Sequence, residues 1–166
     1  QGISLRQYLE SRNQPMSFTE AWNFLLPVME ALEKVHQNKL IHRDISPDNF
    51  IIKEDGSIKL LDFGSAREYA EEKTMTVLVK KGYAPPEQYS RKGKQGPWTD
   101  IYSICATLYE MITGVIPQPA MERLKADKLY LPSSYGCDIT PLQEKILMKG
   151  LALDCLLYTS DAADDK

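Results

Sequence analysis

The sequence predicts a mainly helical domain that contains one small β-hairpin. Apolar residues recur at three- and four-residue steps over several long stretches, which is the period of an amphipathic helix. One pair of short apolar runs, at 49–52 and 58–61, flanks a turn-forming segment. The 166 residues are 43% hydrophobic and 26% charged, which suits one domain with a packed core.

Capping residues predict the first two helices. Ser4 can cap a short helix that ends near Arg12. Residues 17–20, Ser-Phe-Thr-Glu, form a capping box ahead of a long helix. The buried stripe of that long helix is expected to consist of Trp22, Leu25, Leu26, Met29, Leu32, Val35 and His36.

The period changes in the middle of the chain. Residues 53–56, Lys-Glu-Asp-Gly, form the expected hairpin turn between the two apolar runs. Residues 65–79 are polar and weakly patterned, so we expect a mobile loop there.

Two further helices follow. Residues 100–113 are apolar nearly all round, so this helix should be buried on most faces and end at Gly114. Thr140 caps a last helix that extends to about Leu153, with Pro141 at its first position.

Two motifs carry the chemistry. Residues 42–49 read His-Arg-Asp-Ile-Ser-Pro-Asp-Asn, and residues 62–64, Asp-Phe-Gly, lie at the end of the hairpin. This pair resembles the catalytic loop and the metal loop of the protein kinases. Seven fixed residues, at about 1 in 20 each, make a chance match on the order of 1 in 10⁹.

The resemblance covers residues 1–154 and implies the large, helical lobe of the kinase fold. Residues 82–87, Gly-Tyr-Ala-Pro-Pro-Glu, look like the segment that closes the activation loop. Residues 79–89 resemble bacterial kinases more than animal ones. The implied function is therefore that of a bacterial serine/threonine protein kinase, with a protein substrate.

Phosphoryl transfer needs in-line positioning and charge neutralisation more than covalent chemistry. The resemblance implies that Asp44 orients or accepts the proton of the attacking hydroxyl. It implies that Asp62 and Asn49 hold Mg²⁺ on the phosphates of ATP, which suits a cation that prefers oxygen ligands. Ile51 is expected on the lower wall of the adenine pocket, although strand residues of this kind are more often core.

The family also assigns supporting roles. His42 is expected to pack beneath Phe63, which precedes Gly64, and so to tie the catalytic loop to the metal loop. Asp100 is expected to accept backbone N–H groups of the catalytic loop. A simpler reading of Asp100 is a carboxylate favoured by the helix dipole, and the two readings are compatible.

Arg43 is the position that receives an activation-loop phosphate in this family. Thr74 and Thr76 are the candidate phosphoacceptors, ahead of Tyr69, and phosphate there would order the loop through Arg43. An unmodified polar loop is the alternative.

The chain departs from the family at two facing positions. Ser46 stands where serine/threonine kinases usually carry Lys, and Asp48 stands where tyrosine kinases usually carry Arg. Lys80 stands where the family usually has Thr. We therefore interpret Lys80 as the catalytic ammonium that replaces the missing lysine. An exposed lysine in the pair formed with Lys81 is the alternative.

The limits of the domain also follow from the resemblance. Residues 155–166 look like the translation of a transposon-end sequencing adapter, with a short acidic tail as the alternative. The small lobe, with its Gly-rich loop and strand lysine, is expected upstream of residue 1. The arginine that pairs with Glu87 in the family is missing from its place, so Glu87 should be a partly buried, unpaired charge.

Composition constrains location and partners. The net charge of −3 gives no sign of nucleic-acid or membrane-surface binding, and no apolar run reaches the length of a membrane span. The widely spaced Cys105, Cys137 and Cys155 form no disulfide framework, which indicates a cytoplasmic setting, with an anchor elsewhere in a parent chain left open. Two other functions stay open: a pseudokinase scaffold and a small-molecule phosphotransferase.

Overall fold

The computed structural model describes residues 2–61, 67–68 and 79–154, and it is mostly helical with a small antiparallel sheet. The helices are α1 (Leu5–Ser11), α2 (Phe18–Gln37), α3 (Pro97–Thr113), α4 (Ala120–Arg123) and α5 (Pro141–Gly150). The strands are β1 (Gly2–Ser4), β2 (Leu40–Ile41), β3 (Phe50–Lys53), β4 (Ile58–Leu60) and β5 (Arg67–Glu68). Short 3₁₀ turns lie at Pro47–Asn49, Pro86–Tyr89 and Pro132–Tyr135.

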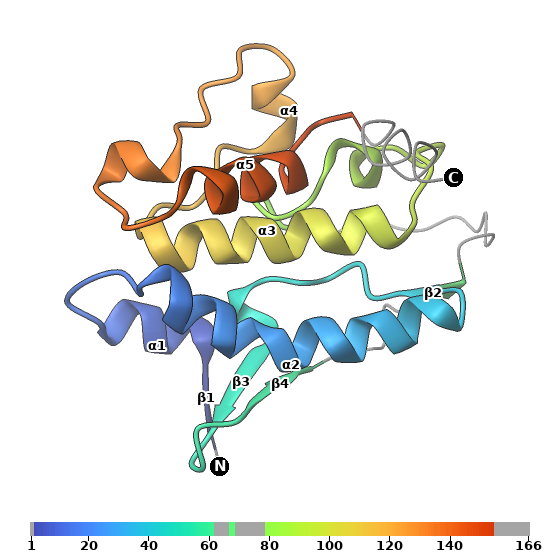
Figure 1. Cartoon of the computed structure of the whole chain (residues 1–166). Helices are drawn as coiled ribbons and strands as arrows, with labels where there is room; N and C mark the ends of the chain where they lie inside the picture. Colours follow the sequence, from blue (N-terminus) through green and yellow to red (C-terminus); the bar gives the residue numbers. More distant parts are fainter. Residues whose placement is uncertain (1, 62–66, 69–78, 155–166) are drawn as a thin grey trace, which may run out of the picture.

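The helices stack in layers around α3. Figure 1 shows α3 between α2 on one side and α5 on the other, with the sheet of β1, β3 and β4 beyond α1 and α2. α3 is buried nearly all round, as its sequence predicts, and it ends at Gly114 in the left-handed conformation (φ 73°). It begins at Pro97, three residues earlier than expected. The central helix α3 therefore supports two segments: the loop that follows β2 and the segment that precedes α3.

The predicted helix caps are largely confirmed. Ser4 and Gln7 form a capping box at α1, and Thr140 and Gln143 form another at α5. The capping box predicted at residues 17–20 is wrong: the side chain of Ser17 accepts the N–H of Glu20, but the Glu20 carboxylate accepts from Arg12 at 2.9 Å instead of from the backbone of Ser17. α5 ends at Gly150, three residues before the predicted Leu153.

The buried stripe of α2 differs from the predicted one. Its buried residues are Ala21, Leu25, Val28 and Leu32. Trp22 and Leu26 were expected in the core but are 40% and 39% exposed. Trp22 instead stacks on Phe18 at the surface, with the ring centroids 5.9 Å apart. Small Ala21, rather than Trp22, lies on the buried face, so this face is rotated from the one that hydrophobicity alone indicates.

The sheet has one strand more than the predicted hairpin. β3 and β4 pair as expected, and β1 adds to the other edge of β3, with Ile3 opposite Ile52. Gly2 begins β1, where a Cβ atom would lie 2.4 Å from the carbonyl oxygen of Ile52. Only glycine fits at that approach.

A second, two-stranded pairing joins Leu40–Ile41 to Arg67–Glu68. The prediction of a loop over 65–79 omitted this contact, because two residues give no alternating pattern. No helix in the described parts of the chain combines the length and the apolar character that crossing a bilayer requires.

Candidate active site

The loop of residues 42–49 is anchored to the central helix by one carboxylate. Asp100, in the first turn of α3, is 1% exposed. Its Oδ2 accepts the backbone N–H of His42 (2.8 Å), and its Oδ1 accepts that of Arg43 (2.9 Å). The Nε2 atom of His36 lies 2.8 Å from the same Oδ2 and donates to it, because the carboxylate can only accept. These are backbone bonds of the kind that the resemblance implied for Asp100.

Arg43 has a left-handed backbone, with φ at 70°. A residue other than glycine keeps this conformation only when its surroundings hold it there. Here the N–H of Arg43 donates to Asp100, and its carbonyl accepts the side-chain amide of Gln88 at 2.9 Å. The turn that delivers Asp44 is thus held from two separate elements.

His42 is fully buried beside this turn. Its Nδ1 atom accepts the backbone N–H of Asp44 at 3.2 Å, so its Nε2 atom must carry the proton that is donated to the carbonyl of Leu61 at 2.9 Å. The imidazole therefore joins the loop of Asp44 to the end of β4. Phe63, its expected packing partner, lies outside the described residues, as do Asp62 and Gly64.

Asn49 is turned toward the same loop. Its Nδ2 atom donates to the backbone carbonyl of Asp44 at 2.7 Å, which leaves its Oδ1 atom as the possible cation ligand. The structure brings Asn49 and Asp44 together. The predicted convergence with Asp62 stays a prediction.

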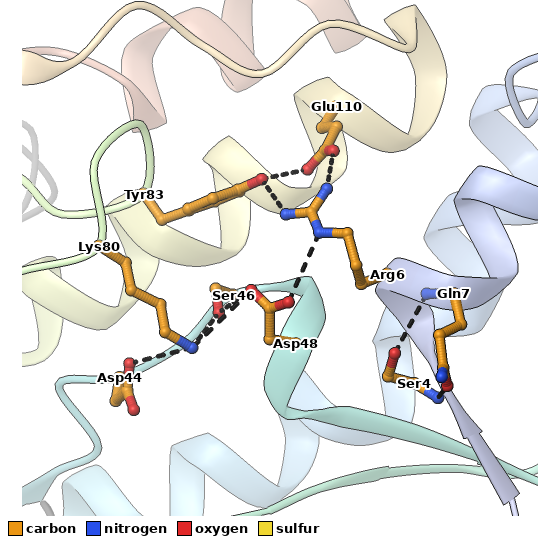
Figure 2. A network of polar contacts seen from close by, with 9 residues as sticks. All are labelled: Ser4, Arg6, Gln7, Asp44, Ser46, Asp48, Lys80, Tyr83 and Glu110. Carbon is orange, nitrogen blue, oxygen red and sulfur yellow. Dashed lines mark hydrogen bonds and ion pairs between the residues drawn. The ribbon is translucent and has the colours of Figure 1, made fainter.

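Lys80 reaches across to this loop from the segment that precedes α3 (Figure 2). Its ammonium donates to the hydroxyl of Ser46 at 2.9 Å. It also lies 3.6 Å from Oδ1 of Asp44 and 3.8 Å from Oδ2 of Asp48. The side chains of Lys80 and Asp44 are 38% and 31% exposed, so both remain accessible to a substrate.

A second polar cluster, missed by the sequence analysis, extends from Asp48 into the core (Figure 2). Arg6 of α1 donates to the carboxylate of Glu110 and to the hydroxyl of Tyr83 at 2.6 Å. Tyr83 in turn donates to Glu110 at 2.5 Å, and Nε of Arg6 lies 3.6 Å from Asp48. Glu110, a carboxylate within an apolar helix, is the sequence signal that could have revealed the cluster, because a buried charge requires a partner.

Burial and charge both act on the pKa values of this cluster. Burial alone would lower the pKa of Arg6, but its hydrogen bond to Tyr83 and the charge of Glu110 raise it above its ordinary value. Burial, and then the hydrogen bond to Glu110, raise the pKa of Tyr83. Arg6 therefore stays charged and Tyr83 stays protonated at physiological pH.

An open cavity of about 570 Å³ lies along β3 and β4. It is lined by Gly2, Ile51 and Leu61 and by the charged residues Lys53, Glu54, Asp55 and Lys59. Leu61 is 39% exposed, which makes an apolar surface next to the end of β4. Ile51 thus lies at a cavity rather than in the closed core.

Glu87 lies in the turn Pro86–Tyr89 and is half-buried. Its carboxylate accepts the hydroxyl of Thr99 at 2.9 Å, and among the described residues no cation forms an ion pair with it. Burial raises its pKa, against the lowering effect of its hydrogen bonds. The candidate phosphoacceptors Thr74 and Thr76, and Tyr69, lie outside the described residues.

The chain is similar in sequence to known proteins. The model of the protein kinase domain matches residues 1–142. Serine/threonine-protein kinase PrkC of Bacillus subtilis is 32% identical over 166 residues, which cover 93% of this chain. PknL of Mycobacterium tuberculosis is 36% identical over 137 residues (76% of the chain), and PknB of Mycolicibacterium smegmatis is 30% identical over 163 residues (91%).

The chain spans a limited part of these relatives, 25%, 34% and 26% of their respective lengths. The match to the family nevertheless extends over well more than half of the chain and includes the Asp44 loop, Lys80 and the central helix. This chain therefore belongs to the protein kinase domain family.

Proposed function

We propose that this chain is most of the large lobe of a serine/threonine protein kinase, which transfers the γ-phosphate of ATP to a hydroxyl of a protein substrate. The observation that carries the proposal is the setting of Asp44. Its carboxylate is partly exposed, its backbone is bonded to His42 and Asn49, and an ammonium lies 3.6 Å away. A rigidly held carboxylate next to a cation is what in-line phosphoryl transfer requires of the protein.

Asp44 has the role of orienting the attacking hydroxyl. Its carboxylate accepts the hydrogen bond of the substrate Ser or Thr and takes up the proton as the oxygen–phosphorus bond forms and the bond from the γ-phosphorus to the leaving oxygen of ADP breaks. The hydrogen bonds to its backbone restrict the loop, so that the carboxylate keeps its position while the substrate binds.

Lys80 has the role of the missing catalytic lysine. Its bond to Ser46 holds the ammonium next to Asp44, where negative charge on the transferring phosphoryl group is stabilised. The lysine comes from the activation-segment side of the site rather than from the catalytic loop, so its position depends on how residues 79–89 are placed.

The described residues fit ATP and Mg²⁺. Asn49 presents an amide oxygen, with Asp62 as the proposed carboxylate ligand, and bound Mg²⁺ would neutralise phosphate charge. Ile51 and Leu61 offer an apolar wall to a flat base at the cavity along β3 and β4. The glycine-rich loop and strand lysine of the family are proposed to belong to a small lobe in the parent protein, so that residues 1–154 alone turn over negligibly.

Regulation through Arg43 belongs to the same proposal. Phosphate on Thr74 or Thr76 would pair with the Arg43 guanidinium and order the segment that carries Lys80. Mass spectrometry of the active parent protein should find at least one of the two threonines phosphorylated, and two bare threonines would contradict this regulation.

The proposal is tested by γ-phosphate transfer in the full-length protein that contains this chain, with generic protein substrates. Asp44→Asn should lower kcat by roughly 10²- to 10⁴-fold, since the general base is lost. The matched control is Asp138→Asn, an exposed aspartate of the loop before α5, which should leave transfer unchanged.

Three outcomes would contradict the proposal. Nucleotide binding without any transfer would favour a pseudokinase scaffold, and transfer to aminoglycosides but not to proteins would favour a small-molecule phosphotransferase. Equal activity of the Asp44→Asn and unaltered proteins would remove Asp44 from the reaction.

A further inference from the structure

The peptide unit between Arg43 and Asp44 is held on both of its polar atoms. Its N–H, which belongs to Asp44, donates to Nδ1 of His42 at 3.2 Å. Its carbonyl, which belongs to Arg43, accepts from Nε2 of Gln88 at 2.9 Å. Because Arg43 has a φ of 70°, this peptide sits in a strained backbone that would relax if its partners were lost.

Gln88 belongs to a different segment of the chain from the other residues that bond to this turn. Asp100 and Asn49 belong to the central helix and to the loop itself, whereas Gln88 lies in the turn Pro86–Tyr89, seven residues after Lys81. Its side-chain amide donates to the carbonyl of Arg43, which lies 45 positions earlier in the sequence. It is therefore a direct bond from residues 79–89 to the backbone that carries Asp44.

The bond also needs a donor at position 88. A carbonyl accepts only, so the side chain at position 88 must donate, which Gln can do and Glu or Met cannot. Gln88, Arg43, Asp44 and Lys80 line the same small pocket, which is partly open to solvent. A side chain of the same length without a donor would occupy the place of the Gln88 amide next to the Arg43 carbonyl, so no water molecule could replace the lost hydrogen bond there.

We infer that Gln88 is a positioning residue for the proposed reaction: it holds the Arg43–Asp44 peptide and thereby aims the Asp44 carboxylate according to the placement of residues 79–89. The inference rests on the proposed kinase function. It assigns to Gln88 no contact with substrate or nucleotide. Its effect should therefore appear in kcat and not in the KM for ATP.

The test uses two substitutions of different size in the full-length protein. Gln88→Met fills the same space without a donor, and kcat should fall roughly 3- to 10-fold, the worth of one hydrogen bond, with an unchanged KM for ATP. Gln88→Ala opens space for a water molecule that can donate to the Arg43 carbonyl, so its loss should be smaller. A larger loss for Ala than for Met would overturn the inference.

A matched control separates positioning from general stability. Ser103→Ala removes the hydrogen bond from α3 to the carbonyl of Tyr83 at 2.8 Å; Ser103 lines the same small pocket as Gln88, but its hydroxyl bonds to the carbonyls of Tyr83 and Thr99 and not to the Arg43–Asp44 peptide. It should lower the melting temperature and leave kcat unchanged. An equal loss of kcat in Ser103→Ala and Gln88→Met would overturn the inference.

A double variant tests whether Gln88 acts through Asp44. In an Asp44→Asn background, Gln88→Met should have little further effect on the residual rate, because groups that act as a unit are not additive. The same fold loss in both backgrounds would overturn the inference.

One readout is independent of activity. In ¹⁵N-labelled protein, Gln88→Met should shift the amide resonance of Asp44 and speed its hydrogen exchange, whereas Ser103→Ala should not. If the unaltered protein shows normal transfer and the Asp44 amide of Gln88→Met does not shift, the inference about Gln88 is overturned and the proposed function stands. Absent transfer by the unaltered protein would overturn the proposed function and, with it, the reaction that Gln88 serves.

Discussion

The ammonium of Lys80 donates to the hydroxyl of Ser46 at 2.9 Å, across 34 positions of sequence. Ser46 occupies the place where serine/threonine kinases usually carry a lysine. The ammonium of Lys80 therefore supplies a cation at this place, but the lysine belongs to the segment on the opposite side of the site. Asp48, 3.8 Å away, helps to hold it there.

The first prediction concerns Lys80. Lys80→Ala in the full-length protein should lower turnover by roughly 10²-fold, because charge on the transferring group loses its partner. The exposed neighbour Lys81 is the control, and Lys81→Ala should have little effect. Ser46→Lys combined with Lys80→Ala should recover a large part of the rate. Near-normal turnover of Lys80→Ala in a steady-state transfer assay would end the interpretation.

The second prediction concerns the anchor of the catalytic loop. Asp100→Ala removes the carboxylate that accepts the N–H groups of His42 and Arg43, at about 1–3 kcal/mol for each lost hydrogen bond. We expect urea denaturation to show a loss of roughly 2–5 kcal/mol in the free energy of unfolding. Asp138→Ala, at an exposed position, should change it by less than about 0.5 kcal/mol. Equal stability of the two variants would contradict the anchoring role.

The third prediction concerns pH and Glu87. Burial raises the pKa of Glu87 above its ordinary 4.5, so the folded state binds the proton more tightly than the unfolded state does. Its contribution to stability is complete below pH 4.5 and is lost as the pH rises through the folded-state pKa. Glu87→Gln, which mimics the protonated acid, should therefore be more stable than the unaltered protein at pH 7.

The advantage of Glu87→Gln should disappear near pH 4.5, where the carboxyl of the unaltered protein is protonated as well. Urea denaturation at the two pH values measures it. Glu10→Gln, at an exposed position, should show no such dependence. An advantage that grows toward acid pH would show that the sign is wrong.

The fourth prediction concerns the cluster of Arg6, Tyr83 and Glu110. Arg6→Leu leaves the Glu110 carboxylate, which is 7% exposed, without its cation, and should cost roughly 3 kcal/mol. Arg6→Leu combined with Glu110→Leu should cost less than Arg6→Leu alone, because no bare charge remains. Additive losses in denaturant unfolding would show that the two side chains do not act as a pair.

Local signals predicted the helices well. The caps at Ser4 and Thr140 and the helix end at Gly114 depend on neighbouring residues only, so the sequence could predict them. The third strand could not, because Gly2–Ser4 is too short for a pattern and its partner lies about fifty positions later. The stripe of α2 was misjudged because small Ala21, rather than large Trp22, is buried.

The candidate site likewise has a part that the sequence could predict and a part that it could not. The positions of His42, Asp44 and Asn49 come from one continuous motif, so a resemblance could supply them. The Arg6–Glu110 pair and the Gln88–Arg43 bond depend on how distant segments pack, over 104 and 45 positions respectively. Such contacts leave no local pattern.

β1 and α1 set a practical limit on where the gene can be cut for recombinant expression. Leu5 is fully buried, Gly2–Ser4 completes the sheet, and Arg6 neutralises Glu110. A coding boundary placed after residue 11 would remove all three at once, which exposes the edge of β3 and leaves the Glu110 carboxylate without its cation. Primers for domain expression should therefore anneal ahead of the codon for Gly2.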